Sequence, residues 1–338
     1  MINFQYARAT DVADAVRQIA VDPTAKFIAG GTNLIDLMKE DVERPSRLID
    51  ITRLPLKNVE DTANGGVRIG ALVPNSDLAY HPLIAERYPM LASAILAGAS
   101  AQLRNMASTG GNLLQRTRCY YFYDTATPCN KREPGSGCSA ITGLNRMHAI
   151  LGTSAACIAT HPSDMCVALA ALDATAIVTG QAGERTIAFA DFHRLPGDTP
   201  QRDTNLQPNE IITAIELPAK GFAANYTYLK IRDRLSYAFA LVSVAAALEL
   251  EGDVIKEARL ALGGVAHKPW RDLSAEAVLR GQAADQVTYT RAADVLLRDA
   301  KGFEHNAFKI ALARRAIVRA LTQAAAGTPQ SQSNKKIG

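Results

Sequence analysis

The 338-residue sequence lacks several features that would place a protein in a class at once. No apolar run reaches the roughly 18 to 20 residues of a membrane-spanning helix, so we expect no membrane insertion. The first residues lack the basic and apolar regions of a secretory signal, and we expect the chain by itself to stay in the cytoplasm. The net charge is only +4, without a long run of one sign, and this gives no support to nucleic-acid binding.

Cysteine is also scarce. Five cysteines in this length are far below the density of a secreted disulfide scaffold, and an odd number leaves at least one thiol unpaired. The hydrophobic fraction of 48% and the charged fraction of 21% are typical of a well-packed globular protein. The length suits two or three domains rather than one.

The order of the expected elements indicates an α+β protein. Strand, helix and glycine-turn signals divide the chain into three units and a tail that is expected to be disordered, with these bounds: 1–55, 56–220, 224–326 and 327–338. The third unit has three long expected strands, at 226–231, 237–250 and 254–262. Three expected helices follow these strands, the last at 307–325, and the unit therefore has the pattern of a separate α+β domain.

Two glycine turns carry the first functional signal. One is Ala29-Gly-Gly-Thr-Asn33, between an expected strand at 26–28 and a helix beginning at Leu34; the other is Ser108-Thr-Gly-Gly-Asn112. Such turns permit positive φ and expose backbone N–H groups, so a pyrophosphate can approach closely. The G-x-G-x-x-G spacing of dinucleotide-binding loops is absent, and two ordinary tight turns are the alternative.

Four of the five cysteines lie in one segment, with the spacing C-x9-C-x8-C-x18-C: Cys119, Cys129, Cys138 and Cys157. This spacing lacks the close cysteine pairs of zinc fingers and ribbons. Two disulfides would need an oxidising compartment, whereas four thiolates fit the ligand count of an iron–sulfur cluster. Basic residues that would lower the thiol pKa values crowd the same segment: Arg116, Arg118, Lys131, Arg132 and Arg146. A solvated basic loop with buried free cysteines is the alternative.

The remaining candidates have simpler interpretations. Cys166 lies in a run of small apolar residues and is expected to pack inside a helix. His161-Pro-Ser-Asp164 is expected to cap that helix, although Asp164 could also accept a hydrogen bond from a cofactor. No nucleophile with a placed base is found, so hydrolase chemistry has no support. The aromatic residues 120–123 are expected to pack around the cysteine loop.

Several of these motifs occur together in a known family. The two glycine turns, with Tyr228–Arg232 and Gly263–Arg271, resemble the FAD-binding subunit of molybdenum hydroxylases, the xanthine dehydrogenase family, over roughly residues 1 to 325. The resemblance implies an α+β fold with a two-part FAD-binding domain of the vanillyl-alcohol-oxidase (PCMH) type. A C-terminal α+β domain like that of CO dehydrogenase flavoproteins would follow it.

The resemblance also implies a set of cofactor-binding residues. The FAD pyrophosphate would lie on the first turn and its flanks, at Phe27, Ile28, Ala29, Gly30, Gly31, Thr32, Asn33 and Leu34. The second clamp would be Ser108, Thr109, Gly110, Gly111 and Asn112. Asp164 matches an acidic residue that contacts FAD in the family, and Lys230 matches a lysine near the flavin. Ile212 falls near an apolar contact of the family, although its alignment with that position is less certain than for the other residues.

The cysteine segment resembles one branch of this family. Arg116-Thr-Arg-Cys119, Pro128-Cys-Asn-Lys-Arg132 and Pro134-Gly-Ser-Gly-Cys138 look like the loop, here about 115–158, that adds a [4Fe–4S] cluster. The nearest match is the FAD subunit of bacterial periplasmic aldehyde oxidoreductase; the flavin subunit of 4-hydroxybenzoyl-CoA reductase is less similar. Cys119, Cys129, Cys138 and Cys157 would then be the cluster ligands.

The resemblance implies an electron-transfer subunit of a heterotrimeric, molybdenum-dependent aldehyde oxidoreductase. Aldehyde would be oxidised in a molybdenum-cofactor large subunit, and electrons would pass through a [2Fe–2S] small subunit to FAD in this chain and then to an external acceptor. No residue of this chain would be catalytic. The alternatives are a flavin subunit of a 4-hydroxybenzoyl-CoA-reductase-like or xanthine-dehydrogenase-like complex, and a scaffold that binds zinc or no metal. Periplasmic export with a partner that carries a twin-arginine signal is implied, and a cytoplasmic location is the alternative.

Overall fold

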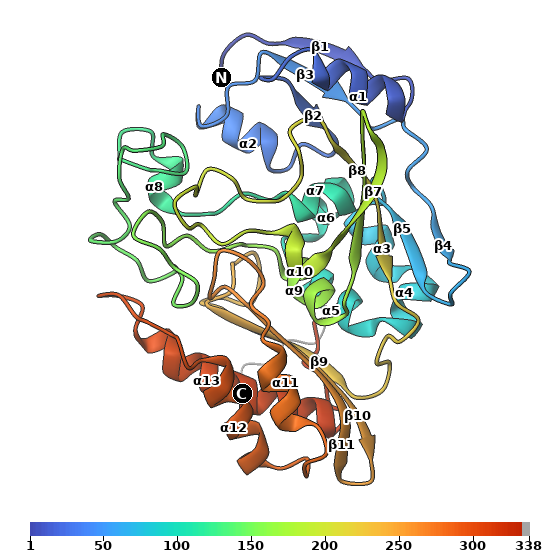
Figure 1. Cartoon of the computed structure of the whole chain (residues 1–338), viewed down its shortest axis with the longest axis vertical. Coiled ribbons are helices and arrows are strands. Elements are labelled where there is room, and N and C mark those ends of the chain that lie inside the picture. The colour runs from blue at the N-terminus through green and yellow to red at the C-terminus, as the bar shows by residue number, and fades with distance from the viewer. Residues whose placement is uncertain (333–338) are drawn as a thin grey trace.

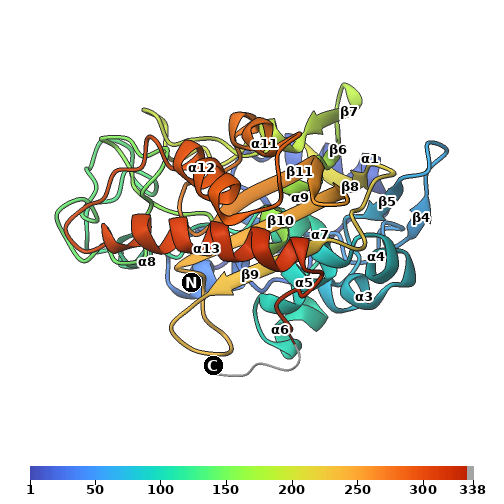
Figure 2. The same ribbon diagram turned by 90° about the horizontal axis from the view of Figure 1, so that it is seen from below.

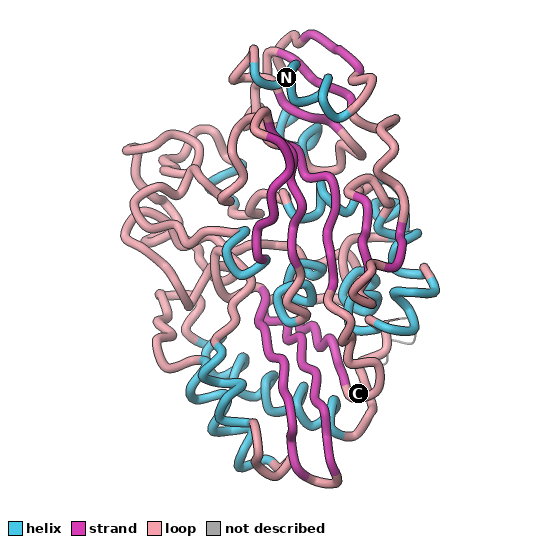
Figure 3. Tube along the Cα trace, turned by 45° about the vertical axis from the view of Figure 1, so that its right-hand side comes forward, coloured by secondary structure: helices cyan, strands magenta, loops and turns pink. Residues whose placement is uncertain are grey.

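The computed structural model describes residues 1–332 and has three β-sheets arranged one below another along the long axis of the molecule (Figure 1). The N-terminal sheet lies at the top of that view, the central sheet in the middle and the C-terminal sheet at the bottom. Between α8 (Tyr120–Tyr123) and α9 (Asp164–Ala171), the chain is almost entirely loop and lies to one side of the central sheet (Figure 3). In the part of the chain described, no helix is long and apolar enough to cross a membrane.

The N-terminal unit alternates strands and helices, as its sequence predicts. Its parallel sheet has the order β1-β3-β2. The elements are β1 (Gln5–Arg8), α1 (Val12–Ala20), β2 (Lys26–Ile28), α2 (Leu34–Lys39) and β3 (Arg47–Asp50). Asp11 caps α1 by accepting a hydrogen bond from the backbone N–H of Asp14, and the apolar face of α1 packs into a core that also includes Leu72 and Ile211 of the central unit. The first glycine turn follows β2 directly, so α2 begins where that turn ends.

The central unit is an antiparallel sheet with helices packed against it. The strand order is β4-β5-β8-β6-β7, with β4 (Val59–Asp61), β5 (Val67–Gly70), β6 (Thr175–Gly180), β7 (Gly183–Ala188) and β8 (Ile211–Leu217). Its other helices are α3 (Asn75–Tyr80), α4 (Pro82–Arg87), α5 (Pro89–Ala97), α6 (Ala101–Met106), α7 (Thr109–Leu113) and α10 (Phe189–Phe192). Every residue of α9 is buried, because this short apolar helix packs against α5 on one side and the C-terminal sheet on the other.

The C-terminal unit is an antiparallel sheet covered on both faces. Its order is β11-β10-β9, with β9 (Tyr226–Ile231), β10 (Val242–Glu251) and β11 (Val254–Gly263). α11 (Leu273–Leu279), α12 (Gln286–Leu296) and α13 (Phe308–Ala325) lie over one face (Figure 2). α5 and α9 cover the other face, so β10 is buried without interruption from Val242 to Leu248 instead of alternating with polar residues.

Some sequence predictions of local structure are wrong. The strand expected at 237–250 begins only at Val242, because Tyr237 has a positive φ of 49° that no strand residue adopts. No strand forms at 155–160, where the chain continues as loop. β4 and β7 were not predicted. The unit boundaries at 55/56 and 220–224 stay predictions.

The prediction that residues 327–338 form a disordered tail is wrong for the first of these residues. After α13 the chain returns along β9, where the Gln330 side chain accepts a hydrogen bond from the backbone N–H of Lys230 (2.9 Å). The Gln332 side chain donates to the carbonyl of Tyr228 (3.2 Å), and the Gln330 N–H donates to the Thr227 hydroxyl (3.0 Å). Residues 327–332 are therefore placed by the edge of β9, and residues 333–338 lie outside the described part of the chain.

Candidate cofactor site

The two glycine turns, which come from different units, lie against each other. A Cβ atom at Gly30 would lie 1.7 Å from the carbonyl oxygen of Met106, two residues before the second turn begins. Only glycine permits this approach, and Gly31 adds a positive φ of 71°. Residues 27–34 are all partly exposed, so a ligand can reach their backbone. The turns therefore form one continuous surface rather than two separate loops.

The second turn has one half fixed to the sheet and one half free to face a ligand. Ser108 caps α7 by accepting a hydrogen bond from the Gly111 N–H. Thr109 and Gly110 are buried and donate to the carbonyls of residues 73 and 71 after β5, at 2.9 and 2.7 Å. Gly111 is exposed and Asn112 partly exposed, so these two are the turn's accessible members. We assign contact with a cofactor to this second half and support of the turn to the first.

A pocket of about 490 Å³, partly open to solvent, lies next to the second turn. This larger pocket is lined by residues 117–120, 147–148, 160–164, 239–240, 243 and 263–264. Its wall is joined to the turn because the hydroxyl of Ser163 lies 2.5 Å from Oδ1 of Asn112. Ser163 also caps α9 by accepting from the Cys166 N–H, which confirms the capping role predicted for this stretch.

A buried ion pair lies at the wall of the larger pocket, next to Ser163. Asp164 Oδ2 lies 2.7 Å from Nζ of Lys230, and its Oδ1 accepts a hydrogen bond from the hydroxyl of Tyr228 at 2.7 Å. Burial raises the pKa of Tyr228 well above its ordinary value, so this phenol stays a donor. Lys230 also donates to the carbonyl of Ala97 at 3.1 Å. The network joins α9 of the central unit to β9 of the C-terminal unit at the pocket wall.

Ile212 differs from the other predicted contacts. Its side chain is buried in β8 and belongs to the core that α5 and α9 share with the central sheet. Neither of the two pockets described here is lined by it. Its predicted contact with a cofactor has no support from this geometry.

The four cysteines of the loop segment line one smaller pocket of about 280 Å³, partly open to solvent. All four thiols are free rather than joined as disulfides. Residues 129 and 138 pair through an isolated antiparallel bridge, which brings two distant parts of the loop together. Phe122 and Lys131 also line this pocket and are almost completely buried. The loop therefore folds around its cysteines.

Backbone N–H groups near three of the four cysteines act to lower their pKa values. Those of residues 121 and 122 act on Cys119, and those of residues 140, 141 and 158 act on Cys138. Cys157 accepts from the N–H of Ala159 at 3.4 Å. The interaction between the Cys157 and Cys138 side chains lowers the pKa of Cys138 and raises that of Cys157. Burial raises the pKa of Cys119 to about 12. In iron–sulfur proteins, hydrogen bonds to the ligand sulfur atoms help to set the reduction potential.

The donor set bears on the kind of metal that could bind here. A tetrahedral zinc ion holds its ligand atoms about 3.3 to 3.8 Å apart, because its bonds are about 2.0 to 2.3 Å long. None of the four loop cysteines belongs to the described group of donor atoms that all lie within 4.8 Å of one another. Four thiols around one pocket match the number of thiolates that holds a four-iron cluster.

A second group of metal-type ligands is more compact. Donor atoms of His161, Cys166 and His193 lie within 4.8 Å of one another. Nε2 of His193 donates to the carbonyl of Leu113 (2.9 Å), and the ring centroids of His161 and His193 are 4.3 Å apart. Cys166 is completely buried in the central core, as its sequence predicts. We interpret this group as packing behind the second glycine turn.

Comparison with known proteins agrees with this arrangement along the whole chain. Residues 2–220 match the FAD-binding domain of molybdopterin dehydrogenases, and residues 226–324 match the C-terminal domain of CO dehydrogenase flavoproteins. The aldehyde oxidoreductase FAD-binding subunit PaoB of Escherichia coli is 52% identical over 324 residues, covering 96% of this chain and 98% of that protein. The chain belongs to the FAD-binding subunits of the molybdenum hydroxylase family. It is an oxidoreductase subunit with an FAD-binding domain.

More distant relatives share the fold. The glyceraldehyde dehydrogenase medium chain of Sulfolobus acidocaldarius is 30% identical over 274 residues, covering 81% of this chain and 79% of that protein. A chain of the carbon monoxide dehydrogenase of Hydrogenophaga pseudoflava superimposes with a TM-score of 0.75 at 27% identity, covering 97% of this chain and 99% of that one. Several relatives are described as medium chains or subunits of complexes. The predicted fold class, an FAD-binding domain followed by a CO-dehydrogenase-flavoprotein C-terminal domain, is confirmed.

The basic residues of the flavin subunit's cysteine loop do not act as the sequence predicts. Only Lys131 lines the cysteine pocket, where its charge acts to lower the pKa of Cys157. The others are paired elsewhere: Arg116 with Glu43 and Asp203, Arg118 with Asp36, Arg146 with Asp233, and Arg132 with the backbone carbonyls of Tyr121 and Phe122. These pairs hold the loop to its surroundings instead of offsetting thiolate charge.

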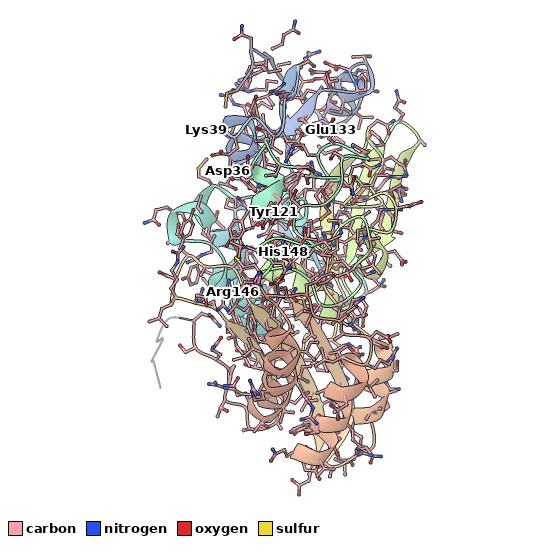
Figure 4. All side chains as sticks on the ribbon, turned by 90° about the vertical axis from the view of Figure 1, so that its left-hand side faces the viewer. Asp36, Lys39, Tyr121, Glu133, Arg146 and His148 are labelled. Carbon is pink, nitrogen blue, oxygen red and sulfur yellow. The ribbon has the colours of Figure 1, made fainter. Side chains whose placement is uncertain are left out.

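Sequence reasoning missed one residue at the cysteine pocket. Nε2 of His148 lies 3.1 Å from Sγ of Cys119. Burial is the main cause that lowers the pKa of His148, to about 4. Figure 4 shows His148 close to Tyr121 on the face that carries the cysteine loop; their ring centroids are 6.3 Å apart. No sequence motif marks this histidine, because its contact is made across an irregular loop.

Proposed function

We propose that the chain is the FAD- and [4Fe–4S]-binding electron-transfer subunit of a molybdenum-dependent aldehyde oxidoreductase. In this proposal a molybdenum-cofactor large subunit oxidises the aldehyde, and a [2Fe–2S] small subunit passes the electrons to FAD in this chain. An external acceptor then takes them from FAD. The observation that carries the proposal is the 52% identity, over nearly both full lengths, to an aldehyde oxidoreductase FAD-binding subunit.

The proposed FAD site consists of the joined glycine turns and the larger pocket. The accessible backbone N–H groups of residues 29–33 would hold the pyrophosphate, because the N–H groups of such a turn bind anions. The exposed Gly111 and the partly exposed Asn112 would lie beside it. The flavin ring would enter the larger pocket, where Asp164 is held in one orientation by Lys230 and Tyr228. When bound, FAD supplies the exchange between two-electron and one-electron chemistry, and the protein supplies position and electrostatics.

The proposed cluster site is the smaller pocket. Four free cysteines line it, which is the number of thiolates that holds a four-iron cluster, and the N–H of Ala159 donates to the sulfur of Cys157. Phe122 closes the pocket as an apolar wall, which limits access of water to a cluster. This chain has no candidate catalytic residue for the aldehyde, so its part is to bind and tune cofactors.

Metal and flavin analysis of the complex co-expressed with its large and small subunits tests both cofactors. We expect one FAD per trimer and about four irons beyond those of the small subunit's centres. Cys129→Ser should remove the extra iron and keep the flavin, because the two pockets are built from largely different residues. Cys166→Ser is the matched control, because this cysteine is buried away from the cluster pocket. This variant should keep both the extra iron and the flavin.

A complex that lacks flavin or the extra iron would contradict the corresponding half of the proposal. The substrate is tested separately by assaying aldehydes, an aryl-CoA thioester and xanthine on the same preparation. Turnover of aldehydes alone supports the proposal. Turnover of the thioester or of xanthine would instead indicate that the chain is the flavin subunit of another kind of complex.

We also propose that the complex is periplasmic, exported in its folded state with a partner that carries a twin-arginine signal. The support is the resemblance to periplasmic aldehyde oxidoreductase subunits. Fractionation of cells that express the complex with an intact or a Lys-Lys-substituted signal on the large subunit tests it. Recovery of this chain from the cytoplasm in both cases would contradict it.

A further inference from the structure

A histidine stands at the boundary between the two pockets. Thr117 and Cys119 line both of them, so this short stretch is their common wall. His148 lines the larger pocket and lies 3.1 Å, through Nε2, from the sulfur of Cys119. The imidazole therefore contacts a proposed cluster ligand from the side proposed for the flavin.

The backbone of His148 is fixed although it lies in a loop. Its N–H donates to the carbonyl of Asn145 at 2.9 Å, and its carbonyl accepts from Nζ of Lys309 at 2.8 Å and from Nδ2 of Asn306 at 3.3 Å. Lys309 and Asn306 are completely buried, at the start of α13 and just before it. The C-terminal unit thus holds this ring against a cysteine of the central unit.

The direction of the hydrogen bond follows from the chemistry of the ligand. A thiolate bound to iron has no proton to give, so Nε2 must carry the proton and donate it to sulfur. Nδ1 then carries only a lone pair, and it has no hydrogen-bond partner among the described residues. An unpaired acceptor at this position is consistent with that tautomer, whereas the opposite tautomer would bury an unpaired donor.

We propose that His148 is a positioning residue that donates a hydrogen bond to the Cys119 thiolate and thereby raises the reduction potential of the cluster. The inference rests on the proposed function. Reduction adds negative charge to the cluster and its sulfur atoms, and a hydrogen bond to sulfur stabilises the reduced form more than the oxidised form. Because His148 itself is buried, its hydrogen bond acts at low local dielectric, where it is stronger than in water.

The test is a redox titration of the cluster in the purified complex, followed by electron paramagnetic resonance. His148→Leu removes the donor at similar volume, and we expect full iron and FAD content with a lower potential. The expected shift corresponds to about a tenfold change in the equilibrium constant of one-electron reduction, or about 59 mV. His148→Gln keeps an N–H donor and should restore part of the shift. His305→Leu is the control, since His305 is exposed and precedes the same helix.

A second measurement does not depend on the potential. Complex labelled with nitrogen-15 in histidine only should show a weak nitrogen hyperfine coupling on the reduced cluster, which His148→Leu abolishes and His305→Leu retains. If His148→Leu assembles without iron, His148→Met, which is apolar and more flexible, is measured in its place. A cluster of unchanged or higher potential overturns this inference alone. A wild-type complex without the extra iron overturns the proposed cluster and this inference with it.

Discussion

Of the glycines described, Gly30 has the least space for a Cβ atom. We predict that Gly30→Ala abolishes FAD binding, because its Cβ would lie 1.7 Å from a backbone carbonyl that cannot move aside. Flavin content of the purified complex measures this. Gly252→Ala is the control: it has a positive φ of 57° in the turn between β10 and β11 but open space around it. It should cost about 1 kcal/mol of stability and leave FAD bound. Retention of FAD by Gly30→Ala would show that the turns can separate.

At the scale of residues, the sequence shows which residue types occur at which spacing. It does not show which residues from distant parts of the chain lie in contact. The two glycine turns and the four cysteines are recognisable because each needs a particular residue type at a particular spacing. The approach of Gly30 to Met106 and of His148 to Cys119 depends on how separate units pack. Neither Met106 nor His148 belongs to a motif. Ile212 is the converse case, in which a family register placed a core residue in the site.

At the scale of elements, a buried lysine ties the cysteine loop to two other segments. Nζ of Lys131 lies 2.5 Å from Oδ1 of Asp203, 2.7 Å from the carbonyl of Pro200 and 2.6 Å from Nε2 of His267. Asp203 is also paired with Arg116, and these cations hold its pKa below the usual range although burial acts to raise it. The cysteine loop lacks the regular backbone hydrogen bonds of a helix or a sheet, and these side-chain contacts hold it in place instead.

Lys131→Met should therefore destabilise the chain by about 3 kcal/mol, because it leaves buried acceptors without their shared donor. The midpoint of urea unfolding, followed by the fluorescence of Trp270, the single tryptophan, measures this. Lys256→Met is the control and should cost well under 1 kcal/mol, since Lys256 forms an exposed pair with Glu251. Equal costs for the two variants would contradict the importance of burial here.

The elements that the sequence predicts are those with a buried face. β9 and β11 and the three last helices carry regular apolar patterns, and each forms within a few residues of its predicted bounds. β4 and β7 lie at the two edges of the central sheet and are mostly exposed, so their residues carry no such pattern. The cysteine loop has no periodicity at all, and its path follows from the pockets and pairs that it forms.

At the scale of the whole molecule, buried histidines make the free energy of unfolding depend on pH. Burial is the main cause that lowers the pKa values of His193 and His267 to about 4. The unfolded chain takes up protons near pH 6.5, but the folded chain does not until about pH 4. Below pH 6.5 the unfolded state thus binds more protons, and the free energy of unfolding falls as the pH falls. Each histidine contributes about 1.4 kcal/mol per pH unit across this window.

We predict that His193→Gln makes the stability of the chain less sensitive to acid. The glutamine amide can still donate to the carbonyl of Leu113 but takes up no proton in this range. Urea midpoints at pH 7.5, 6.5 and 5.5 should therefore fall less steeply than in the wild type. His305→Gln, which changes an exposed side chain, should leave the slope unaltered. A slope in His193→Gln equal to that of the wild type would mean that His193 is already charged in the folded chain.

The return of the chain along β9 has a consequence for self-association. β9 is the outer strand of the C-terminal sheet, and its outward backbone groups at Tyr228 and Lys230 would otherwise be free to pair with a strand of another molecule. Gln330 and Gln332 occupy those groups with side-chain amides, which satisfy them without extending the sheet. Gln330 and Gln332 therefore protect the edge of β9 against edge-to-edge aggregation.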